Sequence, residues 1–275
     1  MRDRLAEIAR TAPGRLGICI YDVATDERFS LRGGESFALA GVSRLPIAAV
    51  AYRLADQKRF RLDDRVFVRR GDFRRGSSEI ARDHPRGGLP LTYWELVRAM
   101  LTTGDTTASD IVLRAIGGPT AAGNILARAG LRGITLRKSA AEIASDARFH
   151  RTFASGGENG GTPDGVADLL VGVATGRYAL LDGTSELLYD LSNARDGANR
   201  LRAGLPAAIR LAHASGTSDS ALASTDATND VGLLTLPDGR RIAVVALLGE
   251  SSADEATREA TLARVARSVA DAYGP

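Results

Sequence analysis

Two short segments of the chain combine small residues with groups that could hold an anion. Residues 41–44 (Gly-Val-Ser-Arg) stand at the start of a hydrophobic helix predicted from residue 43 to about 54, where free backbone N–H groups favour a negative charge. Residues 214–217 (Ala-Ser-Gly-Thr) stand at the end of a predicted strand. Each segment also has a structural interpretation, as a helix cap formed by Ser43 and as a turn of small residues. Taken alone, neither segment establishes a function.

The other residues that could do chemistry do not form a motif. Three histidines, His84, His150 and His213, are scattered and lack the spacing of metal ligands. Cys19 is the single cysteine, which excludes an intrachain disulfide and a cysteine-rich zinc cluster. The sequence contains neither the glycine fingerprint of a dinucleotide site nor a Walker-type phosphate loop. We therefore expect no metal and no cofactor.

Hydrophobic periodicity predicts the elements that position these segments. Strands are expected at residues 16–23, 28–31, 209–214, 230–236 and 241–248. Helices are expected at the N-terminus and at residues 43–54, 92–102, 107–116, 119–129, 163–174 and 252–273, with loops at 69–88 and 155–161. Strands at both chain ends, with helices between them, indicate an α+β fold: an antiparallel five-stranded sheet flanked by terminal helices, plus an inserted all-helical lobe. The sheet lobe is assigned to residues 1–40 and 192–275 and the helical lobe to residues 41–191, with an active-site-like cleft between them.

Composition restricts the classes of partner. The chain has 275 residues, 44% of them hydrophobic and 25% charged, which is typical of a globular protein. All of its 36 basic residues except Lys58 and Lys138 are arginines, and they are spread along the chain. Because no basic stripe is interleaved with aromatic residues, we expect no nucleic-acid partner. No apolar run is long enough to span a bilayer and no secretory signal is recognisable, so we expect no membrane partner and a cytoplasmic protein, or a secreted one already trimmed.

Several segments in succession resemble class A serine β-lactamases and, more broadly, the penicillin-recognising fold. The resemblance covers nearly the whole chain, from the first helix to the last. Residues 37–47 (Phe-Ala-Leu-Ala-Gly-Val-Ser-Arg-Leu-Pro-Ile) resemble the family's nucleophile helix, and residues 103–108 and 116–119 resemble its Ser-Asp-Asn loop and the adjoining helices. Residues 159–163 resemble the end of the omega loop. Residues 200–206, 214–217 and 228–240 resemble the Lys-Thr-Gly strand and its surroundings. The resemblance implies a β-lactamase/transpeptidase-like fold.

The residues that the family uses for catalysis are replaced. The family requires Ser-x-x-Lys, but Gly41 stands at the serine position and Arg44 at the lysine position. A guanidinium stays protonated and cannot accept the proton of a nucleophile. The Ser-Asp-Asn triplet is Gly104, Asp105 and Thr106, so only its aspartate is kept.

Two further catalytic groups of the family have no counterpart. Ala214 replaces the lysine of Lys-Thr-Gly. The omega-loop glutamate has no match, since Glu142 and Glu158 are the nearest acids and both are out of register. Losing the nucleophile alone removes nearly all serine-dependent rate. The sequence therefore predicts that serine acylation is absent and assigns no catalytic residue.

More of the family's ligand-binding groups than of its catalytic groups have a counterpart in this sequence. The family's oxyanion hole is made of two backbone N–H groups, carried over here to Gly41 and Thr217, and backbone donors survive side-chain replacement. Ser215 matches the hydroxyl that holds the substrate carboxylate, and Arg200 matches an arginine that pairs with that carboxylate in many members. Gly41 also leaves space that could admit a ligand or a water. The predicted ligand-binding residues are Gly41, Arg44, Asp105, Arg200, Ser215, Gly216 and Thr217.

Three hypotheses for the function follow. The first is a non-hydrolysing homologue that binds a small anionic molecule, specifically a small carboxylate, or an unknown protein partner in the former active-site cleft. The second is an enzyme with non-serine chemistry and a biosynthetic role in the same cleft, and the third is residual β-lactam hydrolysis. The structural alternative is that Ser215 and Arg200 are inherited polar residues without a ligand.

Overall fold

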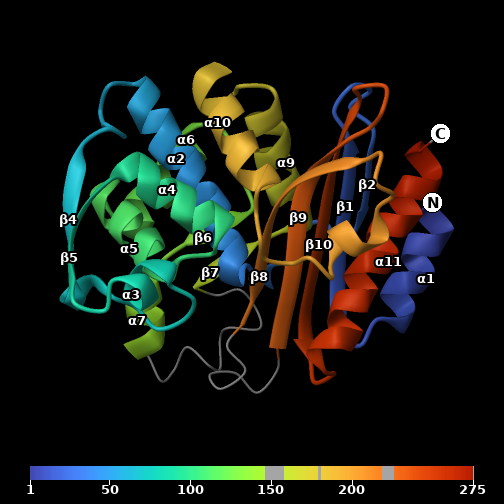
Figure 1. Ribbon diagram of the computed structural model, residues 1–275. Coiled ribbons are helices and arrows are strands. Elements are labelled where there is room, and N and C mark those ends of the chain that lie inside the picture. The colour runs from blue at the N-terminus through green and yellow to red at the C-terminus, as the bar shows by residue number, and fades with distance from the viewer. Residues whose placement is uncertain (146–157, 179–180, 219–225, 275) are drawn as a thin grey trace.

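Both ends of the chain contribute to one antiparallel sheet of five strands, as the sequence predicted (Figure 1). The computed structural model describes residues 1–145, 158–178, 181–218 and 226–274. The strand order is β2-β1-β10-β9-β8, so that strands from the two chain ends pair in the middle of the sheet. The strand bounds are β1 (Arg15–Asp22), β2 (Arg28–Leu31), β8 (Arg210–Thr217), β9 (Asp226–Thr235) and β10 (Arg241–Ser251).

Both faces of the sheet are covered, which explains why its central strands are apolar throughout. In β10, Ile242, Val244 and Ala246 face the terminal helices α1 (Arg2–Thr11) and α11 (Glu255–Tyr273), and the residues between them face the helical lobe. Figure 1 shows α1 and α11 side by side on the outer face of the sheet. Burying both faces removes apolar surface from water on two sides, so the strand shows no polar alternation.

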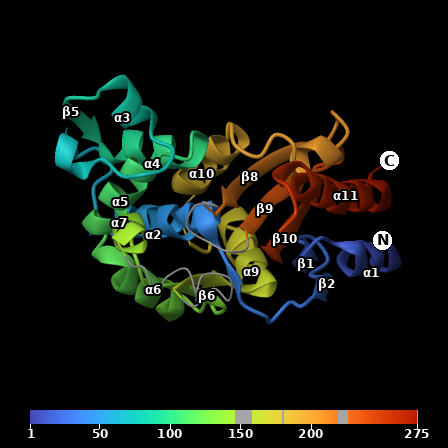
Figure 2. The same ribbon diagram turned by 90° about the horizontal axis from the view of Figure 1, so that it is seen from below.

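The helical lobe is built around α2 (Arg44–Asp56), whose residues from Leu45 to Tyr52 are all buried. A helix that is apolar on all sides belongs inside a core, and α2 contacts α4, α5, α6 and α10 (Figure 2). The helix bounds are α3 (Glu79–Asp83), α4 (Tyr93–Thr102), α5 (Thr106–Ala115), α6 (Gly118–Arg128), α7 (Ala140–Ser145), α9 (Pro163–Ala174) and α10 (Leu181–Ser192). None of the helices within the described ranges combines the length and the apolar composition that a bilayer crossing requires.

Short elements complete the fold, and some of them differ from the sequence-based expectation. The region 69–88, expected to be a loop, contains α3 and a 3-10 turn, because Ser78 caps α3 and β4 (Arg65–Arg69) pairs with β5 (Gly87–Thr92) across it. Part of the loop expected at 155–161 lies outside the described residues, and Asn159–Gly161 forms strand β7. The remaining elements are β3 (Phe37–Ala38), β6 (Ile134–Leu136) and the 3-10 helices η1 (Ala40–Ser43), η2 (Arg70–Asp72) and η3 (Leu201–Gly204).

One buried carboxylate joins two helices of the lobe. Asp190 of α10 is almost completely buried, and its Oδ1 lies 3.3 Å from Nε of Arg98 in α4. Burial raises the pKa of Asp190 to about 6, with Arg98 opposing the shift and Glu186 adding to it. Because the folded state holds this proton more tightly than the unfolded state, Asp190 reduces stability as the pH rises from about 4 to about 6.

We predict that Asp190→Asn increases the free energy of unfolding at pH 7 relative to the wild type, by on the order of 2 kcal/mol. The gain should shrink as the pH falls towards 4, where the native Asp190 is protonated. Urea denaturation of both proteins between pH 4 and 8 measures the difference. Asp63→Asn, at an exposed residue, controls for loss of a negative charge, and a gain independent of pH would contradict the prediction.

Candidate functional site

A close contact between two backbone segments forms the base of the candidate site. The 3-10 helix η1 lies against the edge strand β8, so that the two segments singled out in the sequence do meet. A Cβ atom built on Gly216 would collide with the nitrogen of Gly41 and stand 2.7 Å from that of Val42. Residues 214–217 form the end of β8 and not a turn. Glycine is therefore required at position 216 for η1 to reach the strand.

Asn229 holds the approach to η1 in place. Its side-chain nitrogen donates hydrogen bonds to the carbonyl oxygens of Ala38 (2.7 Å) and Leu39 (3.1 Å), and its side-chain oxygen accepts one from the nitrogen of Leu248 (3.2 Å). Ala40 follows with a φ of 48°, a left-handed conformation that is unfavourable for a residue with a Cβ. The backbone before Gly41 is therefore held in a strained turn by a fully buried amide.

The register of β8 gives Thr217 an outward N–H group. The nitrogen of Ser218 donates to the oxygen of Ala227 at 3.0 Å, which makes this a hydrogen-bonded pair of the β8–β9 ladder. Such pairs alternate with non-hydrogen-bonded ones, so Thr217, opposite Thr228, directs its N–H group away from β9. This is the outer edge of the sheet, where η1 lies, as the predicted backbone donor of Thr217 requires.

Arg44 fills the space beside Gly41 that the sequence left open, and this expectation of free space is wrong. A Cβ built on Gly41 would stand 2.9 Å from Nη1 of Arg44, and one built on Gly104 would stand 2.8 Å from the same atom. The guanidinium thus lies between two glycines that occupy the positions of family serines. Neither position accepts a side chain while Arg44 keeps this conformation.

Among the residues that the structure describes, one carboxylate lies within ion-pair distance of the Arg44 guanidinium. Its Nη1 lies 3.7 Å from Oδ2 of Asp196, in the loop after α10, and its side chain is 19% exposed. Arg44 donates no side-chain hydrogen bond within the part of the chain that the structure describes. Burial lowers the pKa of Arg44, and the nearby charges of Asp196 and Asp105 act in the opposite direction. We call the group of Gly41, Arg44, Gly104, Asp196 and Ser215 the Arg44 site.

Asp105 and Thr106 are tied to neighbouring backbone. Asp105 is fully buried and caps α5, accepting hydrogen bonds from the nitrogen of Ala108 (2.8 Å), the nitrogen of Ile80 (3.0 Å) and the hydroxyl of Ser78 (3.0 Å). The nitrogen of Thr106 donates to the oxygen of Ser77 at 2.8 Å. Asp105 therefore positions the Gly104 turn and offers no surface to a ligand.

Arg200, predicted to hold a ligand carboxylate, is already paired inside the protein. Its Nε donates to Glu259 of α11 at 2.9 Å and its Nη1 to the oxygen of Asn229 at 3.1 Å, and Nη2 bonds the hydroxyl of Thr217. Glu255 lies 3.5 Å away. Two carboxylates thus balance a buried guanidinium, and its donors are directed into protein contacts.

Ser215 keeps a hydroxyl with no hydrogen-bond partner in the described residues. It is largely buried beneath Gly197, where a built Cβ would stand 3.1 Å from its Oγ. Ala214, at the position of the family lysine, is part of the hydrophobic core. Of the groups predicted to bind a ligand carboxylate at this strand, the Ser215 hydroxyl and backbone N–H groups are left, and no lysine ammonium stands beside them at position 214.

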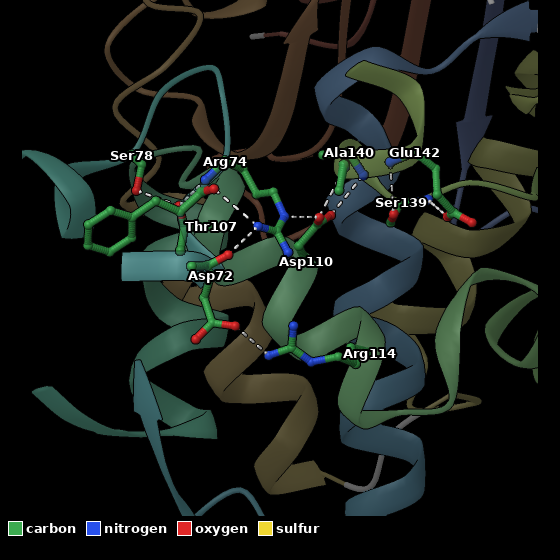
Figure 3. Close-up of polar contacts among 12 residues, drawn as sticks. Asp72, Arg74, Ser78, Thr107, Asp110, Arg114, Ser139, Ala140 and Glu142 are labelled. Atoms are coloured by element: carbon green, nitrogen blue, oxygen red, sulfur yellow. Dashed lines mark hydrogen bonds and ion pairs between the residues drawn. The ribbon is translucent and has the colours of Figure 1, made fainter. Parts of the chain in front are cut away.

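The two acids nearest in sequence to the family glutamate have local partners. The carboxylate of Glu142 accepts a hydrogen bond from the nitrogen of Ser139 at 2.7 Å, and Glu158 lies 3.4 Å from Nζ of Lys138. Figure 3 shows Glu142 folded back on Ser139 at the start of α7, with the carboxylate of Asp110 directed at the nitrogen of Ala140 (2.8 Å). Ser139 and Glu142 thus form a capping box, with Ser139 as the N-cap of α7 and Glu142 as its third residue.

One polar pair was missed by sequence reasoning. His213 and Asp230 are fully buried on adjacent strands, with Nδ1 and Oδ1 2.8 Å apart, and Oδ2 of Asp230 accepts a hydrogen bond from the nitrogen of Leu201. Nε2 of His213 is buried without a partner among the described residues. Their separation of 17 positions carries no motif, and only the strand register brings them together. His84 lies elsewhere and His150 is outside the described residues.

Comparison with known proteins gives a consistent family. Residues 1–273 match the model of the Beta-lactamase enzyme family. Among curated relatives, the chain is 28% identical over 274 residues to a β-lactamase of Mycobacterium tuberculosis (strain ATCC 25177 / H37Ra), covering 98% of this chain and 85% of that protein. It is 24% identical over 269 residues to the extended-spectrum β-lactamase PER-1 of Pseudomonas aeruginosa, covering 97% and 85%.

Solved structures of β-lactamases superpose on this chain over nearly its whole length. A β-lactamase from Chitinophaga pinensis DSM 2588 superposes with a TM-score of 0.91 at 27% identity, covering 98% of each chain. An ancestral class A β-lactamase (GNCA) superposes with a TM-score of 0.88 at 31% identity, covering 99% of each chain. With a family match over almost its whole length and a shared α+β architecture, this chain belongs to the Beta-lactamase enzyme family and has the class A β-lactamase fold.

Proposed function

We propose that this chain is a non-hydrolysing member of its family, which binds a small carboxylate at the Arg44 site without forming an acyl-enzyme. The observation that carries this proposal is the position of the Arg44 guanidinium. Its Nη1 lies 2.9 Å from the point where the Cβ of a residue 41 side chain would stand. Residue 41 therefore supplies no nucleophile, and a side chain at this position would meet the guanidinium and also the backbone oxygen of Ser215 at 2.7 Å.

The chemistry of acyl transfer supports the same conclusion. Covalent catalysis requires a nucleophile and a base that takes its proton. Gly41 supplies no nucleophile, and Arg44 remains a cation although burial lowers its pKa. Ser43 carries the hydroxyl nearest in sequence to Gly41, and this hydroxyl donates a hydrogen bond to the oxygen of Ala40 at 2.8 Å. Since Pro46 follows one turn later, Ser43 has no lysine in its own Ser-x-x-Lys frame.

The features that remain suit an anion. The site and the neighbouring end of β8 combine a guanidinium, the Ser215 hydroxyl and the N–H group of Thr217 at the sheet edge. An arginine and a backbone N–H group both stabilise a negatively charged oxygen. A carboxylate can therefore be bound here although no bond is broken.

We predict that benzylpenicillin leaves the intact mass of the protein unchanged after prolonged incubation, and that nitrocefin is not hydrolysed above the buffer rate. Intact-protein mass spectrometry and absorbance measure the two outcomes, with an active class A β-lactamase as positive control. A covalent adduct on any serine would contradict the proposal and would favour residual hydrolysis. Turnover of nitrocefin without an adduct would favour non-serine chemistry at the site.

A second prediction concerns the steric relation between Gly41 and Arg44. Gly41→Ser should destabilise the protein by about 1–3 kcal/mol, because the new Cβ meets both Nη1 of Arg44 and the oxygen of Ser215 at 2.7 Å. Adding Arg44→Lys removes the first of these contacts and should restore part of the loss. Urea denaturation of the two single variants and the double variant gives the coupling energy, which should exceed about 0.5 kcal/mol.

Arg44→Lys alone is the control for loss of the guanidinium. If the effects of the two substitutions simply add, the guanidinium does not occupy the space beside residue 41, and the observation on which the proposed function rests is refuted.

A further inference from the structure

Arg44 has fewer internal partners than two other arginines of this protein. Arg200 makes hydrogen bonds through all three of its nitrogens, and Arg258 bonds Thr228 at 2.8 Å and the oxygen of Ala253. The contact of Arg44 with Asp196, by contrast, spans 3.7 Å. That distance is well beyond the roughly 2.7–2.9 Å of a charge-assisted hydrogen bond. Arg44 therefore keeps donor capacity that the described residues do not use.

This arrangement is costly for the protein in isolation. A guanidinium that is 19% exposed has lost most of its hydration, and hydrogen bonds to the described residues do not replace it. Gly41 and Gly104 border Nη1 without contributing a polar side chain. An anion placed against the guanidinium would supply the missing acceptors.

The chemical class of that anion follows from the shape of the donor. A guanidinium is planar and presents its N–H groups as a fork that matches the two oxygens of a carboxylate. The N–H group of Thr217 and the hydroxyl of Ser215 belong to the neighbouring strand end and offer further single donors. The ligand must be small at this end, because Arg44 itself fills the space between the two glycines.

Asp196 already brings a carboxylate to the same place. A Cβ built on Gly104 would overlap its Oδ2, so the carboxylate stands at the Gly104 turn beside Arg44. The backbone around Asp196 is fixed, because the nitrogen of Arg195 donates to the oxygen of Thr102 at 2.8 Å and the nitrogen of Arg200 to the oxygen of Gly197 at 3.0 Å. The side chain itself is 46% exposed and accepts no hydrogen bond in the described residues.

We propose that Arg44, and not Arg200, is the group that receives a ligand carboxylate in this protein, and that Asp196 is an internal carboxylate which the ligand displaces from Arg44. This inference rests on the proposed function, since it assigns the anion of that function to one side chain. Ligand binding moves the Asp196 side chain into water, where a 46% exposed carboxylate is already partly hydrated. Affinity is then limited by the Asp196–Arg44 attraction.

The test uses acetate as the probe and neutral acetamide as its matched control, in a chloride-free buffer. Amide resonances of Gly41 and Gly104 in nitrogen-15 NMR spectra of the whole chain report binding. We expect acetate to shift both resonances saturably and acetamide to leave them unchanged. Asp196→Asn should tighten acetate binding about two- to fivefold, the range expected when an exposed ion pair no longer competes.

Two further variants separate Arg44 from general charge effects. Arg44→Gln should weaken acetate binding more than about tenfold, the loss expected for a charge-assisted contact. Asp271→Asn, which removes an exposed carboxylate paired with Arg4 on the terminal helices, should leave the acetate affinity unchanged. A tighter-binding variant cannot arise from unfolding, so Asp196→Asn stays informative even if Arg44→Gln is unstable.

The inference is overturned if acetate does not shift the two resonances, if Asp196→Asn leaves the affinity unchanged, or if folded Arg44→Gln binds as the wild type does. These outcomes are independent of the acylation experiment. An acyl adduct with benzylpenicillin, together with acetate binding that responds to Asp196→Asn, would refute the proposed function and leave the Arg44 assignment standing. The absence of an adduct, with an acetate response that ignores both variants, would refute the assignment alone.

Discussion

The contact of η1 with the edge strand β8 is the constraint on which the site depends. At Gly216 the backbone of the strand approaches the nitrogen of Gly41 so closely that no Cβ can stand between them. This contact fixes the first residue of α2, and α2 is the buried axis of the helical lobe. The orientation of one lobe on the other is therefore set at the same point where Gly41, Arg44 and the end of β8 meet. Asn229 reinforces this contact from beneath with hydrogen bonds to the chain just before η1.

Around this fixed contact, the charges of the site are rearranged relative to the family pattern. Arg200 is neutralised by Glu259 and bonded to Thr217, and so has become part of the connection between the sheet and α11. Ala214 contributes only a methyl group to the core. The positive charge beside Gly41 and Gly104 belongs to Arg44. Among the described residues of the site, this guanidinium is the one cation, and it is carried by the helix that the backbone contact positions.

Much of the fold could be predicted from the sequence, because periodic apolar residues indicate its strands and helices and turn residues indicate where they end. The five strands of the main sheet and most of the longer helices were predicted close to their observed bounds, since each buries a continuous face, but helix α10 (Leu181–Ser192) was not predicted. Strands β4 and β5 were missed because their exposed positions carry charge and glycine, which are typical of loops. The resemblance also placed Gly41, Arg44 and Gly104 in one site, and the structure shows them in contact.

The partners within the site could not be predicted in the same way. Sequence positions indicate that a serine is missing, but not that a long side chain from the next turn fills its place. The pairing of Arg200 with Glu259 joins residues 59 positions apart and depends on how α11 lies against η3. The partner of His213 depends on the register of two adjacent strands. These contacts follow from tertiary packing, which the order of residues along the chain does not show.

The two glycines beside Arg44 have a consequence for substitutions at these positions. A serine at position 41 would meet the guanidinium of Arg44 and the backbone oxygen of Ser215, and a serine at position 104 would meet Arg44 as well as Asp196. Because the same guanidinium borders both positions, a shorter side chain at position 44 would relieve part of the crowding at each of them. Residues 41, 44 and 104 therefore form one sterically coupled group, in which the effect of a change at one position depends on the side chains at the other two.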